Sequence, residues 1–215
     1  MAIPKICGIE TEYAIIQPKL GEQNPIHASS VLVNAYAKQA ELSSKGGVAY
    51  TVEWDFNDET PGNDARGLAP IGSLPPLVET HLVNAVLENG ARFYVDHAHP
   101  EISTPECINA LQVVKYDRSG ERIIELAMSV ANEALPPEEE IVVYKDNSDG
   151  KGNSYGCHEN YLVDRLTPFG EIICHATTHF ITRQIFTGSG KIGVEATGVD
   201  SNSIEYQITQ RADFF

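Results

Sequence analysis

The chain has 215 residues, 42% of them hydrophobic, and a formal net charge of −15 from 30 acidic and 15 basic residues. This hydrophobic fraction supports a sizeable core and excludes wholesale disorder. The acidic balance argues against binding to nucleic acid or to an anionic membrane surface, which both rely on clustered Lys and Arg. The sequence contains no signal-peptide pattern, no membrane-spanning apolar run and no CxxC pair, so we expect a cytoplasmic protein with reduced thiols.

The N-terminal part predicts a strand followed by a helix. Residues 5–16 read KICGIETEYAII, with Glu10 and Glu12 on the face opposite Ile9 and Thr11, as expected for a strand. A helix is expected from an N-cap at Ser29 or Ser30 to about Leu42.

The segment Ser43–Pro76 predicts a long loop inserted into the domain. It is rich in Gly and Pro, and its acidic residues cluster around Trp54 in the stretch WDFNDETPGNDARG. A loop of this length inside a compact domain is usually functional or disordered.

The rest of the chain alternates helices and strands without a regular repeat. Strands dispersed among helices in this way predict an α+β fold with a mainly antiparallel sheet. The expected elements are a helix over Val78–Asn89 stopped by Gly90, a strand over Arg92–Asp96 followed by a loop, a helix over Ser119–Leu135 ended by Pro136 and Pro137, strands over Ile141–Lys145 and His158–Val163, a helix over Glu171–Phe186, and a strand over Ile204–Arg211.

The stretch RFYVDHAHPEISTPE, residues 92–106, predicts a site for phosphate and a divalent cation. Side chains two apart share one face of a strand, so Arg92, Tyr94 and Asp96 project together while Phe93 and Val95 point to a core. Glu101 follows within the next few residues. The alternative is a surface ion pair at the end of a strand.

Glu10 and Glu12 form a second candidate site for a cation. They lie at i and i+2 on one strand, and adjacent carboxylates repel each other unless a cation neutralises them. Mg²⁺ binds carboxylate oxygens together with substrate phosphates. The alternative is a solvent-facing strand that carries two ordinary glutamates.

The histidines indicate no zinc site. His97 and His99 form an HxH pair without a third ligand at zinc spacing, and the HExxH pattern that begins at His158 fails at Leu162. On a strand His158 shares a face with Asn160, which suits contacts to a metal or a nucleotide. The stretch TGSGK fails as a P-loop because Ile185 and Ile192 occupy required positions.

Four stretches in this order together resemble one family: GIETEYAI, NGARFYVDHAHPEISTPE, NSYGCHENYL, and TRQIFTGSGKIG with the later QITQRADFF. This is the family of Pup ligases and Pup deamidase/depupylases, which act on the prokaryotic ubiquitin-like protein Pup. The resemblance covers essentially the whole chain. It implies a glutamine-synthetase-like fold, in which a curved, mainly antiparallel sheet with helices on one face binds ATP and Mg²⁺.

The resemblance also implies roles for single residues. Glu10 and Glu101 correspond to Mg²⁺ ligands, and Tyr94 lies beside the metal. Arg92 and Thr104 correspond to ATP phosphate contacts, and Asp96 to the catalytic aspartate. Two further residues, Glu12 as a metal ligand and His158 as a nucleotide or metal contact, complete the expected site.

Two features resemble the hydrolytic branch of the family. The chain reads YVDHAHPE where ligases typically read YLDVGSHPE, and the segment 43–76 resembles the insert of deamidase/depupylases. The implied activity is nucleotide- and Mg²⁺-dependent deamidation of the C-terminal glutamine of Pup and cleavage of Pup–lysine isopeptide bonds. The alternatives are an ATP-consuming Pup–protein ligase and a non-catalytic fragment.

The family's later segment and its small C-terminal domain have no counterpart in these 215 residues. We therefore expect the N-terminal part of a catalytic domain, incomplete as a sheet, that needs a C-terminal half as partner. Pup and pupylated proteins are the other expected partners.

Overall fold

The computed structural model describes residues 6–21, 24–43, 50–51, 83–96, 98–150, 152–188, 190–196 and 198–214. The chain divides into two compact units. One comprises residues 5–145 and 157–161, and the other comprises residues 1–4, 146–156 and 162–215. All the predicted site residues belong to the first unit.

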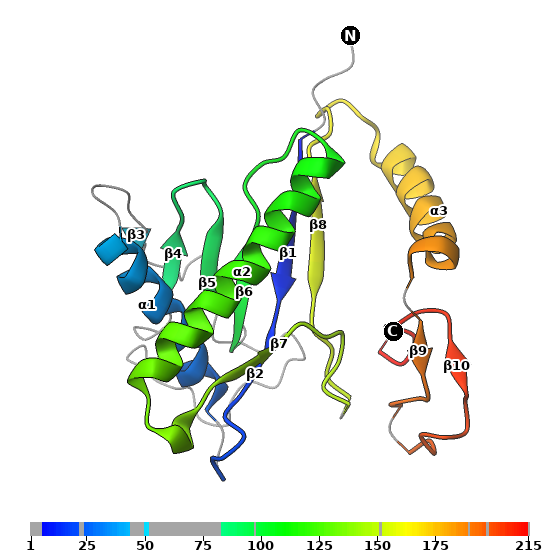
Figure 1. The fold of residues 1–215 in the computed structure, drawn as a ribbon. Helices are drawn as coiled ribbons and strands as arrows, with labels where there is room; N and C mark the ends of the chain where they lie inside the picture. Colours follow the sequence, from blue (N-terminus) through cyan, green and yellow to red (C-terminus); the bar gives the residue numbers. More distant parts are fainter. Residues whose placement is uncertain are drawn as a thin grey trace, which may run out of the picture. The chain divides into compact units, whose positions relative to one another are not determined.

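A six-stranded antiparallel sheet forms the frame of the first unit (Figure 1). The first strand of the unit, β1, pairs with β6 on one side and with β8, the last strand of the unit, on the other. The two ends of this part of the sequence therefore lie side by side in the sheet. In spatial order the strands are β3 (Tyr50–Thr51), β4 (Asn84–Val86), β5 (Arg92–Asp96), β6 (His99–Ser103), β1 (Cys7–Glu12) and β8 (Cys157–Tyr161).

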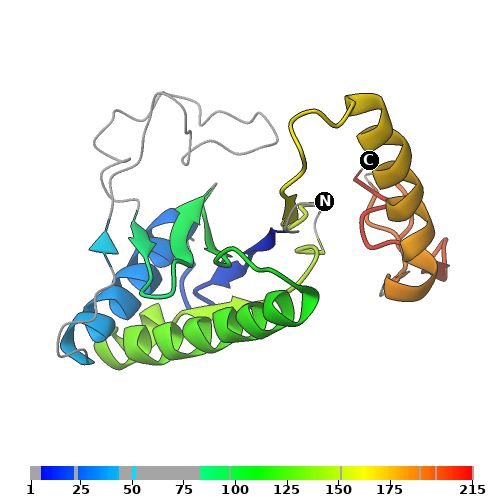
Figure 2. The ribbon, with the colours of Figure 1, turned by 90° about the horizontal axis from the view of Figure 1, so that it is seen from above.

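Two helices, α1 (Pro25–Ser43) and α2 (Ala110–Ala134), cover one face of this sheet (Figure 2). Phe93 and Val95 of β5 are fully buried against them, and the Phe93 ring meets Tyr36 of α1 edge-on at a centroid distance of 6.0 Å. Gly120 lets α2 approach closely, since a Cβ there would lie 3.3 Å from Ile102 of β6. The sequence prediction of an α+β sheet with helices on one face is confirmed.

A small second ladder extends the first unit. Its strands, β2 (Ala14–Ile16) and β7 (Val142–Tyr144), are antiparallel, and the 3₁₀ turn η2 (Pro137–Glu139) precedes β7. The predicted strand over residues 5–16 is therefore two strands, separated at Tyr13.

The second unit contains α3 (Phe169–Thr187) and the short antiparallel pair β9 (Lys191–Ile192) and β10 (Tyr206–Gln207). Lys191 is nearly buried and forms ion pairs with Asp213 at 2.7 Å and Glu195 at 3.1 Å. The helix predicted over Glu171–Phe186 is confirmed, whereas the strand predicted over Ile204–Arg211 is reduced to two residues.

The helix predicted over Val78–Asn89 is wrong for the residues that the structure describes. Asn84–Val86 form β4, and Asn89 and Gly90 close a hairpin into β5. Gly90 has the expected positive φ of 85°, and its amide donates to the carbonyl of Leu87 at 2.9 Å. Val83, Ala85 and Leu87 alternate into the core, so the period of two belongs to a strand. An Asn–Gly pair is a strong hairpin signal, and here it prevails over helix propensity.

Three other elements differ from the prediction. Two helices begin earlier than expected, and a strand lies where a loop was expected. The α2 helix starts nine residues before the predicted Ser119, where the side chain of Asn109 accepts the amide of Gln112 at 3.0 Å. The α1 helix begins at Pro25, a residue favoured in the first helical turn, and not at Ser29 or Ser30. The loop predicted after Asp96 contains β6.

The predicted insert at 43–76 falls mostly outside the described residues. Ser43 ends α1 and Tyr50–Thr51 form β3. The strands predicted over Ile141–Lys145 and His158–Val163 are confirmed as β7 and β8, with ends shifted by a residue or two.

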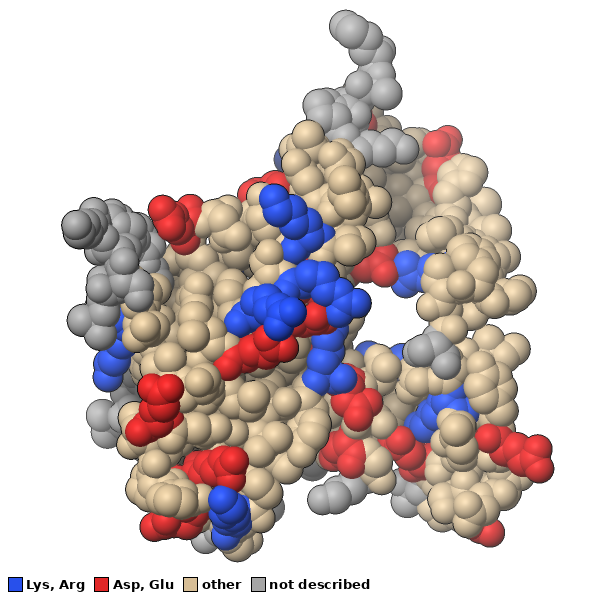
Figure 3. All heavy atoms as spheres, viewed as in Figure 1, with Lys and Arg blue, Asp and Glu red and all other residues tan. Residues whose placement is uncertain are grey.

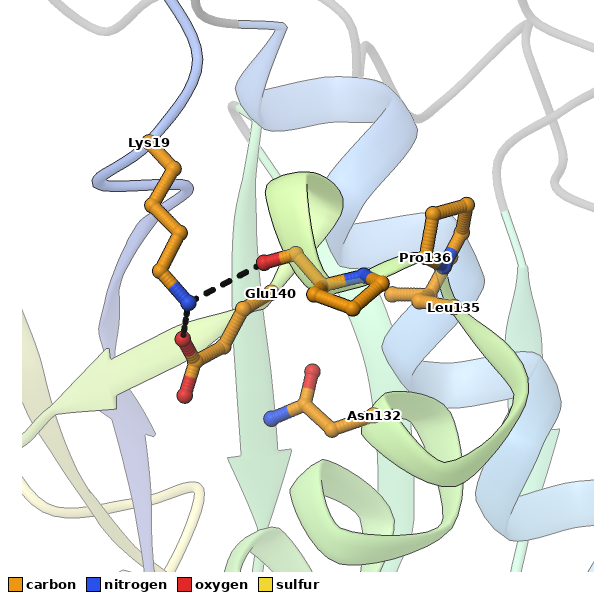
Figure 4. Close-up of a pocket in the computed structure, with 6 residues that line it drawn as sticks. Lys19, Asn132, Leu135, Pro136 and Glu140 are labelled. Atoms are coloured by element: carbon orange, nitrogen blue, oxygen red, sulfur yellow. Dashed lines mark hydrogen bonds and ion pairs between the residues drawn. The ribbon is translucent and has the colours of Figure 1, made fainter.

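The described surface of the first unit has open pockets and a gathering of basic side chains. One pocket, of about 290 Å³, lies at the end of α2, where Lys19 donates to Glu140 at 2.6 Å and to the Pro137 carbonyl at 3.1 Å (Figure 4). It shares no residue with the predicted site. Basic side chains gather over α2 with acidic ones among them (Figure 3). Arg118 bonds Glu121, and Lys145 bonds Asp117 and Glu121, so much of this charge is neutralised locally. No described helix is long and apolar enough to cross a membrane.

Candidate active site

The face of the sheet opposite α1 and α2 collects the predicted polar residues. Register places Glu101 of β6 between Tyr94 of β5 and Glu12 of β1. In the next row Ser103 lies between Arg92 and Glu10, and Glu10 faces His158 of β8. Directly opposite residues in a sheet are side-chain neighbours. Residues from four strands and three distant parts of the sequence thus form one grid.

Tyr94 connects this grid by hydrogen bonds. Its hydroxyl donates to Oε1 of Glu10 at 2.6 Å and lies 3.2 Å from the hydroxyl of Ser103. Burial, followed by the negative charge of Glu101 and the bond to Glu10, raises the pKa of Tyr94 far above its ordinary value. Tyr94 is therefore a neutral phenol that orients the Glu10 carboxylate.

Glu101 is the most deeply buried acid of the site, with 1% of its surface exposed. No amide, hydroxyl or basic group among the described residues donates to either of its carboxylate oxygens. Burial, then the close approach of Glu10 and the charges of Glu12 and Asp96, raise the pKa of Glu101 well above its usual range.

The pKa of Glu10 is shifted in the opposite direction. Burial alone would raise its pKa, but the bond from Tyr94, the close approach of Glu101 and the nearby His158 leave the pKa of Glu10 below its ordinary value. Without a bound cation, Glu101 is therefore the carboxyl group of this pair that favours the protonated form. A buried acid without a donor is costly unless a proton or a cation compensates it.

Glu10, Glu101 and His158 can hold one ion together. One ligand atom from each lies within 4.8 Å of the others, and Nδ1 of His158 is 3.8 Å from Oε1 of Glu10. Carboxylate oxygens are the protein ligands that Mg²⁺ prefers, and the uncompensated oxygens of Glu101 suit such an ion. These residues fit the metal that the sequence predicts at Glu10 and Glu101.

Arg92 occupies the row beside this cluster. Its guanidinium lies 4.3 Å from the centre of the Tyr94 ring, and its Nε donates to Oδ1 of Asn84 at 2.6 Å. Asn84 is buried on β4, so it holds the guanidinium plane in one orientation. A guanidinium fixed in this way matches the fork geometry of phosphate recognition.

Asp96 ends β5 directly opposite His99, the first residue of β6. Nδ1 of His99 is 3.9 Å from Oε2 of Glu12, and the charge of Asp96 contributes to the raised pKa of Glu101. Asp96 is thus presented at the end of a rigid strand, within electrostatic reach of the carboxylate cluster.

Thr104 lies just beyond β6, beside β1. Its hydroxyl accepts the amide of Ile9 at 3.1 Å, and its own amide donates to the carbonyl of Ile9 at 2.9 Å. Gly8 permits this contact, because a Cβ there would lie 3.1 Å from the Thr104 hydroxyl. Thr104 is therefore held against β1, and it directly follows Ser103, which lies between Arg92 and Glu10.

Two residues of the site were missed by sequence reasoning, Asn84 and Ser103. Asn84 was assigned to a helix, and Ser103 to a loop. Ser103 is two residues from Glu101, so an extended reading of HPEIS would have placed both on one face. No local signal marks Asn84 as a partner of Arg92, because the pairing of β4 with β5 creates that contact.

Comparison with known proteins identifies relatives of this chain. A family model described as Pup-ligase protein matches residues 5–215. A depupylase of Acidothermus cellulolyticus is 45% identical over 98% of this chain and 41% of the relative's length. A Pup deamidase/depupylase of Mycolicibacterium smegmatis is 43% identical over 98% of this chain and 42% of the relative. A Pup–protein ligase of a Nocardioides species is 42% identical over 60% of this chain and 28% of the relative.

A crystal structure of the complex between the prokaryotic ubiquitin-like protein Pup and its ligase PafA has the same fold. It superposes with a TM-score of 0.65 at 26% sequence identity, covering 98% of this chain and 35% of that chain. The glutamine-synthetase-like fold predicted from the sequence is thereby confirmed. The chain spans about two fifths of the length of the curated relatives.

Proposed function

This chain belongs to the Pup-ligase family, and on that premise we propose that it supplies the nucleotide- and metal-binding sheet of a Pup deamidase/depupylase. The enzyme hydrolyses the side-chain amide of the C-terminal glutamine of Pup and the isopeptide bond between Pup and a substrate lysine. The observation that carries the proposal is the cluster of Glu10, Glu101 and His158, with Glu101 buried and without a donor.

The cofactors of this proposal are Mg²⁺ and ATP, or ADP with phosphate. Glu10 and Glu101 hold the ion, Glu12 lies next to Glu101 on the same face, and Tyr94 orients Glu10. When bound, the ion supplies charge that neutralises phosphate and polarises a carbonyl. Arg92, Thr104 and His158 are the proposed contacts to nucleotide.

Asp96 is the proposed reacting residue. Its carboxylate attacks the carbonyl carbon of the amide, the C–N bond breaks to release ammonia or the lysine amine, and water hydrolyses the resulting anhydride. Alternatively, Asp96 takes a proton from a water that attacks the same carbon and displaces the same amine. In both cases the developing negative charge on the carbonyl oxygen needs a cationic environment, and Arg92 lies four residues earlier on the same face of β5.

The hydrolytic branch is favoured over the ligase branch by the extent of similarity. The two deamidase/depupylase relatives are 45% and 43% identical over 98% of the chain. The Nocardioides ligase matches 60% of the chain, and a Pup–protein ligase of Corynebacterium urealyticum matches 93% of it at 36% identity. The HAHPE sequence at residues 97–101 and the segment 43–76 point the same way. We place the enzyme in the cytoplasm, where its four free cysteines stay reduced.

We propose that residues 1–215 are the N-terminal part of the catalytic domain and act with a C-terminal half. The test incubates glutamine-ended Pup with ATP, Mg²⁺ and the chain, with and without that half, and weighs the product. Conversion of the terminal amide to an acid supports a deamidase, whereas Pup attached to a lysine with ATP consumed supports a ligase. Unchanged Pup in the complete mixture contradicts both.

A further inference from the structure

The hairpin that carries Asp96 contains an unusual backbone conformation. Asp96 pairs with His99, so only two residues connect β5 to β6. The second of them, Ala98, has a φ of 75°, and it is the only non-glycine residue with a positive φ in the described part of the chain. Residues with a Cβ rarely adopt this left-handed region, so surrounding structure must hold Ala98 there.

Ser29 provides that hold. It lies in the second turn of α1 with none of its surface exposed, and its hydroxyl donates to the carbonyl of Ala98 at 2.9 Å. A serine within a helix commonly bonds a carbonyl of its own helix one turn back. The Ser29 hydroxyl instead reaches a residue 69 positions away in sequence. This bond connects α1 to the turn next to Asp96.

We propose that Ser29 is a positioning residue for Asp96, an inference that rests on the proposed function in which Asp96 reacts. The Ser29 hydroxyl fixes the carbonyl of Ala98, which directly precedes His99, the strand partner of Asp96. The bond thereby sets where β5 ends and where the Asp96 carboxylate points. A displacement of about 1 Å at a reacting group costs up to about a hundredfold in rate. The nucleotide contact at Arg92, four residues earlier, lies outside this turn.

Ser30 is the matched control on the same helix. It is 5% exposed, and its hydroxyl has no hydrogen-bond partner among the described residues. Ser30→Ala and Ser29→Ala remove the same atom from neighbouring buried positions. Only Ser29→Ala removes a bond to the hairpin.

The experiment measures deamidation of glutamine-ended Pup by the enzyme assembled from this chain and its C-terminal half. Ser29→Ala is expected to lower kcat about tenfold or more, with KM and the nucleotide Kd within about twofold of the parent. Ser30→Ala is expected to leave all three unchanged. Because glycine adopts positive φ freely, adding Ala98→Gly to Ser29→Ala should restore most of the lost kcat. Amide exchange at Asp96 and His99 should rise in Ser29→Ala and not in Ser30→Ala.

Three results would overturn the inference: parent-like kcat in Ser29→Ala, equal losses in Ser29→Ala and Ser30→Ala, or no recovery in the double variant. Asp96→Asn separates these results from a failure of the proposed function. Loss of activity in Asp96→Asn together with parent-like Ser29→Ala overturns the positioning role alone. Full activity in Asp96→Asn overturns the proposed role of Asp96 as the reacting residue, on which the inference rests.

Discussion

The Nε of Arg92 donates a 2.6 Å hydrogen bond to the side-chain oxygen of Asn84, which is buried on the adjacent strand. The bond holds the guanidinium 4.3 Å from the centre of the Tyr94 ring, whose hydroxyl donates to Glu10. A cation is thus fixed in the row beside the proposed metal site, which suits the proposed recognition of a metal-bound phosphate.

Removing the Asn84 side chain should weaken nucleotide binding. A buried hydrogen bond to a charged group contributes about 1.5 kcal/mol or more, so Asn84→Ala is expected to raise the ATP Kd about tenfold. Isothermal titration calorimetry with ATP in the presence of Mg²⁺ measures this Kd. Asn34→Ala makes the same truncation at a half-buried residue that lines a groove between α1 and α2; it serves as the control and should bind like the parent. An unchanged Kd in Asn84→Ala would remove Asn84 from the site.

Replacing the carboxyl group of Glu101 by an amide should abolish stabilisation by Mg²⁺. An ion that binds only the folded state raises Tm, and Gln cannot supply the carboxylate ligand. Thermal unfolding with Mg²⁺ and with EDTA should therefore differ by several degrees for the parent and coincide for Glu101→Gln. Glu125→Gln, at an exposed acid on α2, should behave as the parent does. A Mg²⁺ response retained by Glu101→Gln would contradict the assignment.

Replacing Asp96 should stop the chemistry without preventing cofactor binding. Asn neither attacks a carbonyl nor accepts a proton at neutral pH, so deamidation is expected to fall by about 10²- to 10⁴-fold in Asp96→Asn. The ATP Kd should stay within about twofold, because Arg92 and Glu10 are untouched. Mass spectrometry of Pup and nucleotide titration on the same preparation provide both readouts, and retained deamidation would exclude Asp96.

The second unit should lose stability in acid. The bond to Lys191, then those from the Glu195 amide and from Gln207, lower the pKa of Asp213 to about 2. A depressed carboxyl pKa contributes stability above the unfolded value of 3.8, and this contribution is lost as pH falls from there toward about 2. Carbon-13 NMR of the Asp213 carboxyl should show that midpoint. A midpoint near 4 would show that the ion pair with Lys191 is absent in solution.

Residues 1–215 alone should show little deamidation, and a C-terminal half should restore it. The α3 helix exposes large apolar side chains such as Ile181, Ile185 and Phe186, and β8 is an edge strand of the six-stranded sheet. Such surfaces usually pack against further structure. Activity is measured with the halves expressed separately and together, and full turnover by residues 1–215 alone would contradict this expectation.

The sequence by itself determined the fold class and which candidate site residues share one face of a strand. Alternation over Arg92–Asp96 assigned Arg92, Tyr94 and Asp96 to one face, because side chains on a strand alternate by covalent geometry alone. The spacing of Glu10 and Glu12 did the same for β1. Each of these inferences uses only a few consecutive residues.

Tertiary structure alone decided which of these faces meet and what supports them. The order β5–β6–β1–β8 brings Glu101 next to Glu12 and His158 next to Glu10, and burial makes Glu101 an acid in need of a cation. The Asn84–Arg92 and Ser29–Ala98 bonds join segments whose local patterns predicted a helix and a helix cap. Local pattern does not encode such pairings, because the energy that selects them comes from burial and hydrogen bonding between distant segments.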